Sequence, residues 1–240
     1  MRIRQIIFTA CLYAFATTAM SAVNDEVPTI NPTATYTGDN GEEESNDMSG
    51  NAPLYGVFKT NPENVGQYTA HYEWRFTKEG ETEPYLIRYE EDTEYTFTTA
   101  GSHNIVVYAT FVNGNDVIEY TADYWNEIGP MRVTISESKL EMPNAFSPNG
   151  DGQNDIFRVK DDHRSIIQFK GYIFNRWGKK LFEWDDINSG WDGKVGGHDV
   201  ADGVYYCRID AKGADGRVYK IRKAVTLLRS YYEEQNNTEP

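Results

Sequence analysis

The chain has 240 residues and a formal net charge of -14, and 39% of its residues are hydrophobic, which is enough for the cores of one or two domains. Residues 1–142 contain 8 Lys and Arg against 22 Asp and Glu, whereas residues 143–240 contain 15 of each. An acidic chain without a basic stripe cannot neutralise a phosphate backbone, so nucleic acid is excluded as a partner.

The N-terminus, residues 1–22, has the pattern of a secretory signal peptide. Two arginines precede an apolar run over 6–16, and small residues follow at Ala19 and Ala22. The run is shorter than the roughly 20 residues of a spanning helix, and no other stretch is as apolar. We therefore expect an exported chain without a transmembrane helix. The alternative, a lipoprotein, would use Cys11, which lies inside the apolar run.

Removal of the signal peptide leaves Cys207 as the one cysteine, so an internal disulfide is excluded. This residue alternates with Tyr205 and Ile209 along an expected strand. A buried small hydrophobic side chain is favoured over a reactive thiol.

Residues 23–52 are predicted to form an acidic disordered linker. Residues 23–51 contain seven acids, no Lys or Arg and few apolar side chains. Such a composition offers little apolar burial to offset the entropy of ordering.

Residues 53–137 have the pattern of short strands. Tyr68, Ala70, Tyr72, Trp74 and Phe76 alternate onto one face of a strand. Further strand-like segments are YLIRY, EYTFT, NIVVYATF, VIEYTADYW and MRVTI, and a hairpin is expected at 113–116. The spacing predicts an antiparallel sandwich.

The segments YEWRF and EYTFTTAGSHNIVVYATF resemble the polycystic-kidney-disease-like branch of immunoglobulin-like domains. The resemblance implies two packed sheets and a spacer or adhesive unit. A fold of this kind assigns no activity by itself.

After a junction at 138–142, residues 143–230 are predicted to form a second β-domain, followed by a flexible tail at 231–240. Its strand-like segments are IFRVK, IIQFKGYIFN, KKLFEW, GVYYCRIDA and RVYKIRKAVTLLR. The predicted fold is all-β, with two immunoglobulin-like antiparallel β-sandwich domains in tandem.

Motifs follow one another in the second domain: MPNAFSPNGDGQNDIF, IIQFKGYIFNRWG, LFEW, GWDG, DGVYYCRI and VTLLR. Together they resemble the gliding-motility-associated C-terminal domain, the type B sorting domain of type IX secretion cargo. The resemblance carries over these motif residues: Asn144, Pro148, Asn149, Gly150, Asp151, Gly152, Asn154, Asp155, Asn175, Arg176, Trp177, Gly178, Gly190, Trp191, Asp192, Gly193, Asp202, Gly203 and Tyr205.

This resemblance implies an export route. The type IX secretion machinery at the outer membrane would recognise the folded second domain and deliver the chain to the cell surface or the extracellular space. The first domain would then meet an extracellular protein or glycan.

The segment NGDGQND could offer oxygens from Asn149, Asp151, Asn154 and Asp155 to Ca²⁺. The spacing differs from an EF-hand, because Gly152 directly follows Asp151. Asn and Asp also hydrogen-bond their own backbone in turns, and glycine supplies positive φ. Local backbone hydrogen bonding is the favoured interpretation, and calcium is the alternative.

Aromatic side chains suggest a second alternative, a glycan-binding module in which rings stack on sugars. Trp177, Trp184 and Trp191 lie near turns, but tryptophan in a small sandwich usually fills the core, so the core interpretation is favoured. The candidate stacking residues are Tyr85, Tyr89, Trp125, Trp177 and Trp191.

Catalysis is not expected. The four histidines, His71, His103, His163 and His198, are scattered, and the chain lacks His-Glu-x-x-His, Gly-x-Ser-x-Gly and phosphate-binding glycine loops. The acids of RYEEDTEY are explained by a solvated strand edge. We expect a structural or adhesive protein rather than an enzyme.

Overall fold

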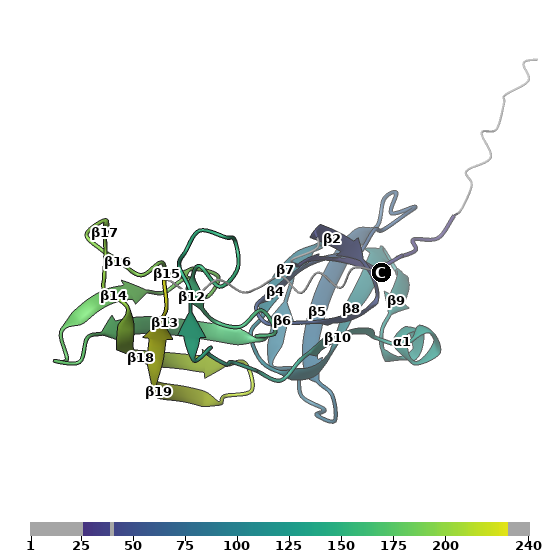
Figure 1. The fold of residues 1–240 in the computed structure, drawn as a ribbon. Coiled ribbons are helices and arrows are strands. Elements are labelled where there is room, and N and C mark those ends of the chain that lie inside the picture. The colour runs from purple at the N-terminus through teal and green to yellow at the C-terminus, as the bar shows by residue number, and fades with distance from the viewer. Residues whose placement is uncertain (1–25, 39–40, 230–240) are drawn as a thin grey trace, which may run out of the picture.

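The computed structural model describes residues 26–38 and 41–229; the expected signal peptide and the tail at 231–240 lie outside them. Two groups of strands lie end to end (Figure 1). Almost every element is a strand and most pairings are antiparallel, which confirms the predicted all-β class with sandwich-like domains.

The first domain has two sheets. The smaller sheet has the strand order β2-β1-β4-β7. Its strands are β1 (Thr33–Gly38), β2 (Gly41–Glu44), β4 (Leu54–Lys59) and β7 (Thr93–Phe97). The larger sheet has the order β3-β10-β8-β5-β6, and β9 also pairs with β8. Its strands are β3 (Asp47–Gly50), β5 (Thr69–Lys78), β6 (Leu86–Arg88), β8 (Gly101–Asn113), β9 (Asp116–Tyr120) and β10 (Met131–Ile135).

The prediction of a disordered linker over 23–52 is wrong, because three segments within it are strands of the first domain. β1 pairs with β4, and the side chains of Ala34 and Tyr36 on β1 are fully buried. β3 adds to the other sheet, parallel to β10. The acids of β2 are exposed. Their charge dominated the composition and concealed the short alternation of apolar side chains in β1.

The core of the first domain is aromatic. Trp74 and Phe76 of β5 are fully buried, as the alternating pattern predicted. From the opposite sheet, the Phe58 ring lies 5.9 Å from the Trp74 ring and 5.3 Å from the Phe76 ring, centroid to centroid. Tilted and edge-to-face ring pairs of this kind contribute beyond simple area burial. These contacts join the two sheets.

One expected strand in the first domain is partly a helix. The segment VIEYTADYW, 117–125, begins in β9 but continues into α1 (Ala122–Ile128). Trp125 on α1 is 6% exposed, and its Nε1 donates to the Val107 carbonyl at 2.7 Å. The helical turn brings this indole back over β8.

The expected hairpin at 113–116 is confirmed by the pairing of Asn113 with Asp116 and by the positive φ of Gly114.

The second domain is built on a five-stranded sheet of order β11-β19-β18-β13-β14. Its strands are β11 (Ala145–Phe146), β13 (Ile166–Phe174), β14 (Lys180–Trp184), β18 (Gly203–Gly213) and β19 (Val218–Leu227). Two short pairs complete the domain: β12 (Phe157–Arg158) with β15 (Gly190–Trp191), and β16 (Lys194–Val195) with β17 (His198–Asp199). Each strand segment expected in this domain overlaps one of these strands.

Cys207 lies on the inward face of β18 and is 2% exposed. Ile209, two residues further along the same face, is fully buried. Burial raises the pKa of the Cys207 thiol to about 11. The prediction of a buried, unreactive cysteine is confirmed by this position.

The two domains are docked through small side chains and backbone groups. Ala214 in the β18–β19 turn is buried in the first domain's core, and its carbonyl accepts a hydrogen bond from Ala100 N at 3.0 Å. Ser165 Oγ accepts from Ala52 N at 3.1 Å and lies 2.8 Å from Ser136 Oγ. The junction is packed as well, because Leu140 belongs to the second core.

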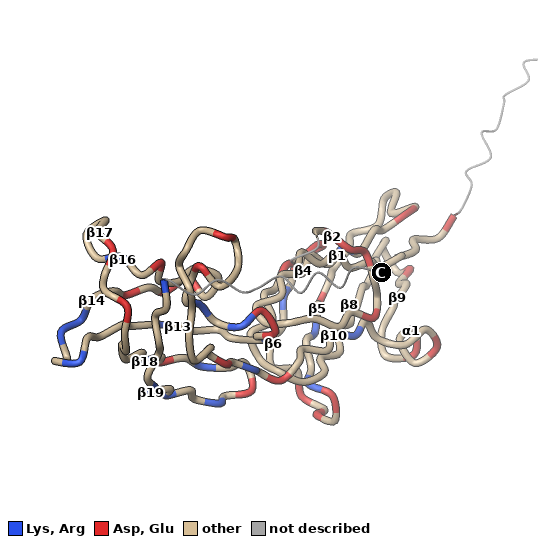
Figure 2. Tube along the Cα trace, viewed as in Figure 1, with Lys and Arg blue, Asp and Glu red and all other residues tan. Residues whose placement is uncertain are grey.

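Charge is divided between the domains. Asp and Glu are frequent along the first domain, whereas Lys and Arg gather on the second (Figure 2). Among the helices that the structure describes, none is long and apolar enough to cross a membrane.

His103 makes the stability of the first domain sensitive to acid. Its ring is 2% exposed, Nδ1 accepts from the Tyr85 hydroxyl at 3.0 Å, and Nε2 donates to the Thr99 carbonyl at 3.0 Å. Burial lowers the pKa of His103 below its ordinary value of 6.5. The unfolded chain therefore takes up this proton at a higher pH than the folded chain does.

We predict that the free energy of unfolding falls as the pH decreases from about 6.5 toward the lower pKa of the folded state. Urea titrations at several pH values would measure this slope. His103→Gln should flatten the slope, whereas the exposed-site control His71→Gln should retain it. An unchanged slope in His103→Gln would assign the acid sensitivity to other groups.

Candidate functional site

The loop that opens the second domain, residues 144–155, is held by its own hydrogen bonds. The Asp155 carboxylate accepts from Gly150 N at 2.7 Å and from Gly152 N at 2.8 Å. Asn149 Oδ1 accepts from Asp151 N at 3.0 Å. The hydrogen bonds to Asp155 lower its pKa below its ordinary value, the bond from Gly150 N having the larger effect and the bond from Gly152 N the next largest. We call this segment the entrance loop.

The entrance loop's composition is explained by this local bonding. Gly150, Gly152 and Asn154 have φ values of 83°, 86° and 52°, a region that glycine and asparagine tolerate best. Both oxygens of Asp155, a candidate calcium ligand, are engaged by backbone amides. Across residues 26–38 and 41–229, no group of three or more His, Cys, Asp or Glu is placed to hold a metal ion.

Arg229 joins the entrance loop to two other motif loops. Its guanidinium donates to the Pro148 carbonyl at 3.1 Å and to the Gly193 carbonyl at 2.8 Å, and forms an ion pair with Asp199 at 3.3 Å. Its backbone N–H donates to the Asp202 carboxylate at 3.1 Å. Three motifs that are separate in sequence therefore meet at one residue, two of them through its side chain and one through its backbone.

Arg229 was not among the predicted site residues, although it ends the closing motif VTLLR. Its position could have indicated a role, because an arginine that follows the domain's last strand can donate hydrogen bonds to the carbonyls of neighbouring loops. Gly193 shows how closely Arg229 approaches. A Cβ at Gly193 would lie 2.9 Å from Arg229 Nη2, and the residue has a φ of +76°. Only glycine meets both conditions readily.

The GWDG motif closes the core beneath these loops. Trp191 is fully buried, and its ring centroid lies 5.4 Å from that of Phe146 and 5.1 Å from that of Tyr205. Its Nε1 donates to the Lys194 carbonyl at 2.9 Å. A Cβ at Gly190 would lie 2.4 Å from the Phe157 carbonyl oxygen, so the close approach of β15 to β12 requires glycine. These motif residues maintain the fold rather than present a surface.

The NRWG motif forms the turn between β13 and β14. Asn175 Oδ1 accepts from Trp177 N and from Lys179 N, each at 3.0 Å, and Gly178 has a φ of 79°. Trp177 is 77% exposed, with the Arg176 guanidinium 4.6 Å from its ring centroid. The core interpretation is therefore wrong for Trp177, because the turn directs this side chain outward, but Trp184 and Trp191 are buried.

The candidate glycan-stacking residues do not form one platform. Trp125 and Trp191 are buried in separate cores, so their rings cannot stack on a sugar. Tyr85 is 40% exposed and bonds to His103, while Tyr89, at 76%, and Trp177, at 77%, belong to different domains.

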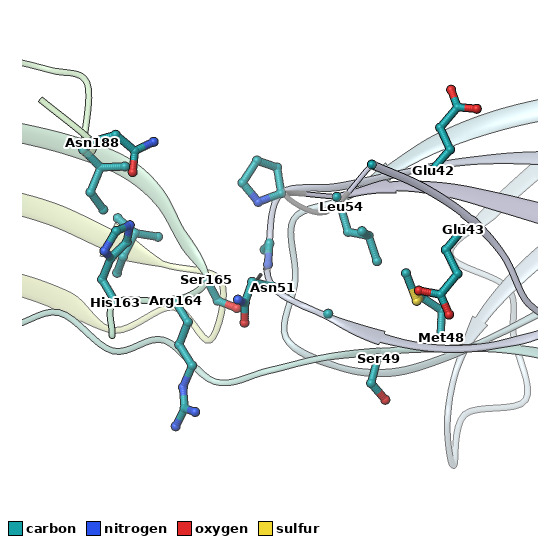
Figure 3. A pocket seen from close by; sticks show the side chains of 17 residues that line it. Glu42, Glu43, Met48, Ser49, Asn51, Leu54, His163, Arg164, Ser165 and Asn188 are labelled. Atoms are coloured by element: carbon teal, nitrogen blue, oxygen red, sulfur yellow. Dashed lines mark hydrogen bonds between the residues drawn. The ribbon is translucent and has the colours of Figure 1, made fainter. Parts of the chain in front are cut away.

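A cleft of about 620 Å³ lies between the two domains. Figure 3 shows Glu42, Glu43 and Met48 on the first-domain side, and His163 and Arg164 on the other. Its lining combines polar and apolar side chains. Its geometry follows from the docking of the domains at Ser165.

Comparison with known proteins identifies the second domain. Residues 140–223 match the family described as the CHU_C type IX secretion signal domain. The C-terminal domain of this chain is a type IX secretion signal domain. The match includes all of the expected sorting-motif residues and ends before Arg229, while the first domain lies outside it. A search of curated proteins finds no match to the chain.

If Arg229 joins the loops of the signal domain, Arg229→Lys should lower the free energy of unfolding by about 1–3 kcal/mol, because lysine retains the charge but cannot donate through a planar fork. Urea unfolding would measure this loss, and limited proteolysis should show faster cleavage in the entrance loop. The control is Arg176→Lys at the exposed turn, expected to change stability by less than about 0.5 kcal/mol. Equal stability of the two variants would contradict the role of Arg229.

Proposed function

We propose that this protein is a non-catalytic cargo of the type IX secretion system that acts as a structural or adhesive unit at the cell surface. The observation that carries the proposal is the match of residues 140–223 to the secretion signal domain. That domain implies recognition by the secretion machinery and export to the cell surface or the extracellular space.

The order of the signal domain supports recognition of a folded shape. The entrance loop is tied by its own backbone bonds, and Arg229 ties it to Gly193 and to the loop that contains Asp202. A pre-organised surface loses little conformational entropy when a partner binds. We infer that the exposed motif residues contact the machinery, while Gly190 and Trp191 preserve the shape.

The working part of the cargo is then the first domain. Its two sheets enclose an aromatic core, and acidic residues are frequent along its chain (Figure 2). We infer a spacer or adhesive role for this sandwich, although a fold of this kind assigns no activity by itself. Docking at Ser165 and Ala214 means that the cargo domain and the signal domain travel as one folded body.

The export proposal is tested with the full chain carrying an epitope after the expected signal peptide. In a cell with a type IX system, antibody should label the protein on intact cells. In a matched strain without the translocon, surface labelling should fall at least tenfold while the periplasmic amount rises. Equal labelling of the two strains would overturn the proposal.

A second measurement tests whether the exposed turn is part of the recognised surface. Trp177→Ala removes an exposed ring from the signal domain, so we expect a lower surface fraction with little change in stability, because no core contact is lost. Tyr89→Ala removes an equally exposed ring from the first domain and should leave export unchanged. The same surface fraction in both variants would remove Trp177 from the recognised surface.

A further inference from the structure

One face of the signal domain's sheet combines aromatic and basic side chains and is not covered by the described part of the chain. In the sheet, β13, β18 and β19 lie side by side. Their side chains alternate between the core and solvent. We call the solvent side the outer face. Its central residues are Tyr172, Phe174, Tyr206, Arg208, Lys220 and Arg222.

The outer face holds like charges next to each other. Arg208 of β18 is the direct cross-strand neighbour of Arg222 of β19. Like charges in this arrangement destabilise a sheet unless an anion lies nearby. Arg208 is paired with Asp210 at 2.6 Å, but none of the ion pairs within residues 26–38 and 41–229 includes Lys220 or Arg222.

Aromatic surface borders these cations. Phe174, Tyr206 and Ala224 form the next row across the three strands, and Tyr206 is 47% exposed. With Arg208 and Arg222 they line a shallow groove of about 490 Å³. A groove that joins apolar surface to the guanidinium group of Arg222, which is in no ion pair of the described residues, suits a partner that carries both carboxylates and an aromatic ring.

The first domain carries a segment with this chemistry, residues 89–94, which we call the acidic loop. Tyr89 is 76% exposed, and Glu90, Glu91, Asp92 and Glu94 follow it. None of these four acids forms an ion pair with the described Lys, Arg or His residues. The acidic loop therefore holds four negative charges without a cationic partner.

The acidic loop is also fixed in position. The Glu91 carbonyl accepts from Trp74 Nε1 at 3.1 Å, and the Asp92 carboxylate accepts from Thr60 N at 3.0 Å. Thr93 Oγ1 donates to Glu90. Ordering costs are small when a segment is held this way before it binds.

We propose that the outer face of one copy binds the acidic loop of a second copy. The ring of Tyr89 would occupy the aromatic row, and the carboxylates would neutralise Arg222. Because the two surfaces differ and lie on different domains, the contact is head-to-tail and can continue from copy to copy. This self-association goes beyond export, and it would assemble the exported protein into chains.

The full-length mature protein is examined by sedimentation velocity over a range of concentrations, at about 0.1 M and about 1 M salt. We expect concentration-dependent association at the lower salt and monomers at the higher, since the Debye length falls from about 10 Å to about 3 Å. Arg222→Glu should weaken association at least tenfold. The matched control Lys194→Glu makes the same charge change at β16, outside the outer face, and should have little effect.

A charge exchange separates the proposed contact from a general effect of net charge. Glu94→Arg makes the chain less acidic, so net charge alone would strengthen association, whereas the proposed contact predicts weakening. The double variant Arg222→Glu with Glu94→Arg should recover association, because the charges are complementary again. The proposal would be overturned if the wild-type chain stays monomeric at the lower salt, or if Glu94→Arg strengthens association. It would also be overturned if the outer face binds an acidic polysaccharide instead of a second copy.

Discussion

Arg229 joins the entrance loop to the loops that contain Gly193 and Asp202. Its guanidinium donates to the carbonyls of Pro148 and Gly193 and forms an ion pair with Asp199. Loop carbonyls that are partly removed from water need donors, and arginine supplies five N–H groups in a rigid plane. A single side chain at the end of β19 therefore converts separate turns into one ordered surface.

This arrangement explains why a recognition domain would be folded before it is recognised. β19 pairs with β18 from Val218 to Leu227, and Arg229 follows directly after this last strand. The surface is complete only when the last strand is in place, so an unfinished chain does not present it. The docking contacts at Ala214 and Ser165 extend this dependence to the first domain, because the β18–β19 turn enters the first domain's core.

The sequence predicted the elements with strong periodicity and missed those whose stability depends on partners. Alternation in β5 and β18 correctly placed Trp74 and Cys207 in the two cores. The strands within 33–50 were missed because exposed acids outnumber their buried side chains, and α1 was missed because one buried residue, Trp125, does not establish a helical period. Trp177 was misplaced because its direction depends on the bonds of Asn175 rather than on its own hydrophobicity.

The same distinction between composition and placement applies to charge. A net charge of -14 implies repulsion between copies. At about 0.15 M salt the Debye length is about 8 Å, so the repulsion between charges farther apart than this is largely screened. Pairs brought into contact are screened less, so a local match between Arg222 and the acidic loop can outweigh the average. In the proposed contact, the placement of charge on the two domains therefore matters more for attraction between copies than the net charge of the chain.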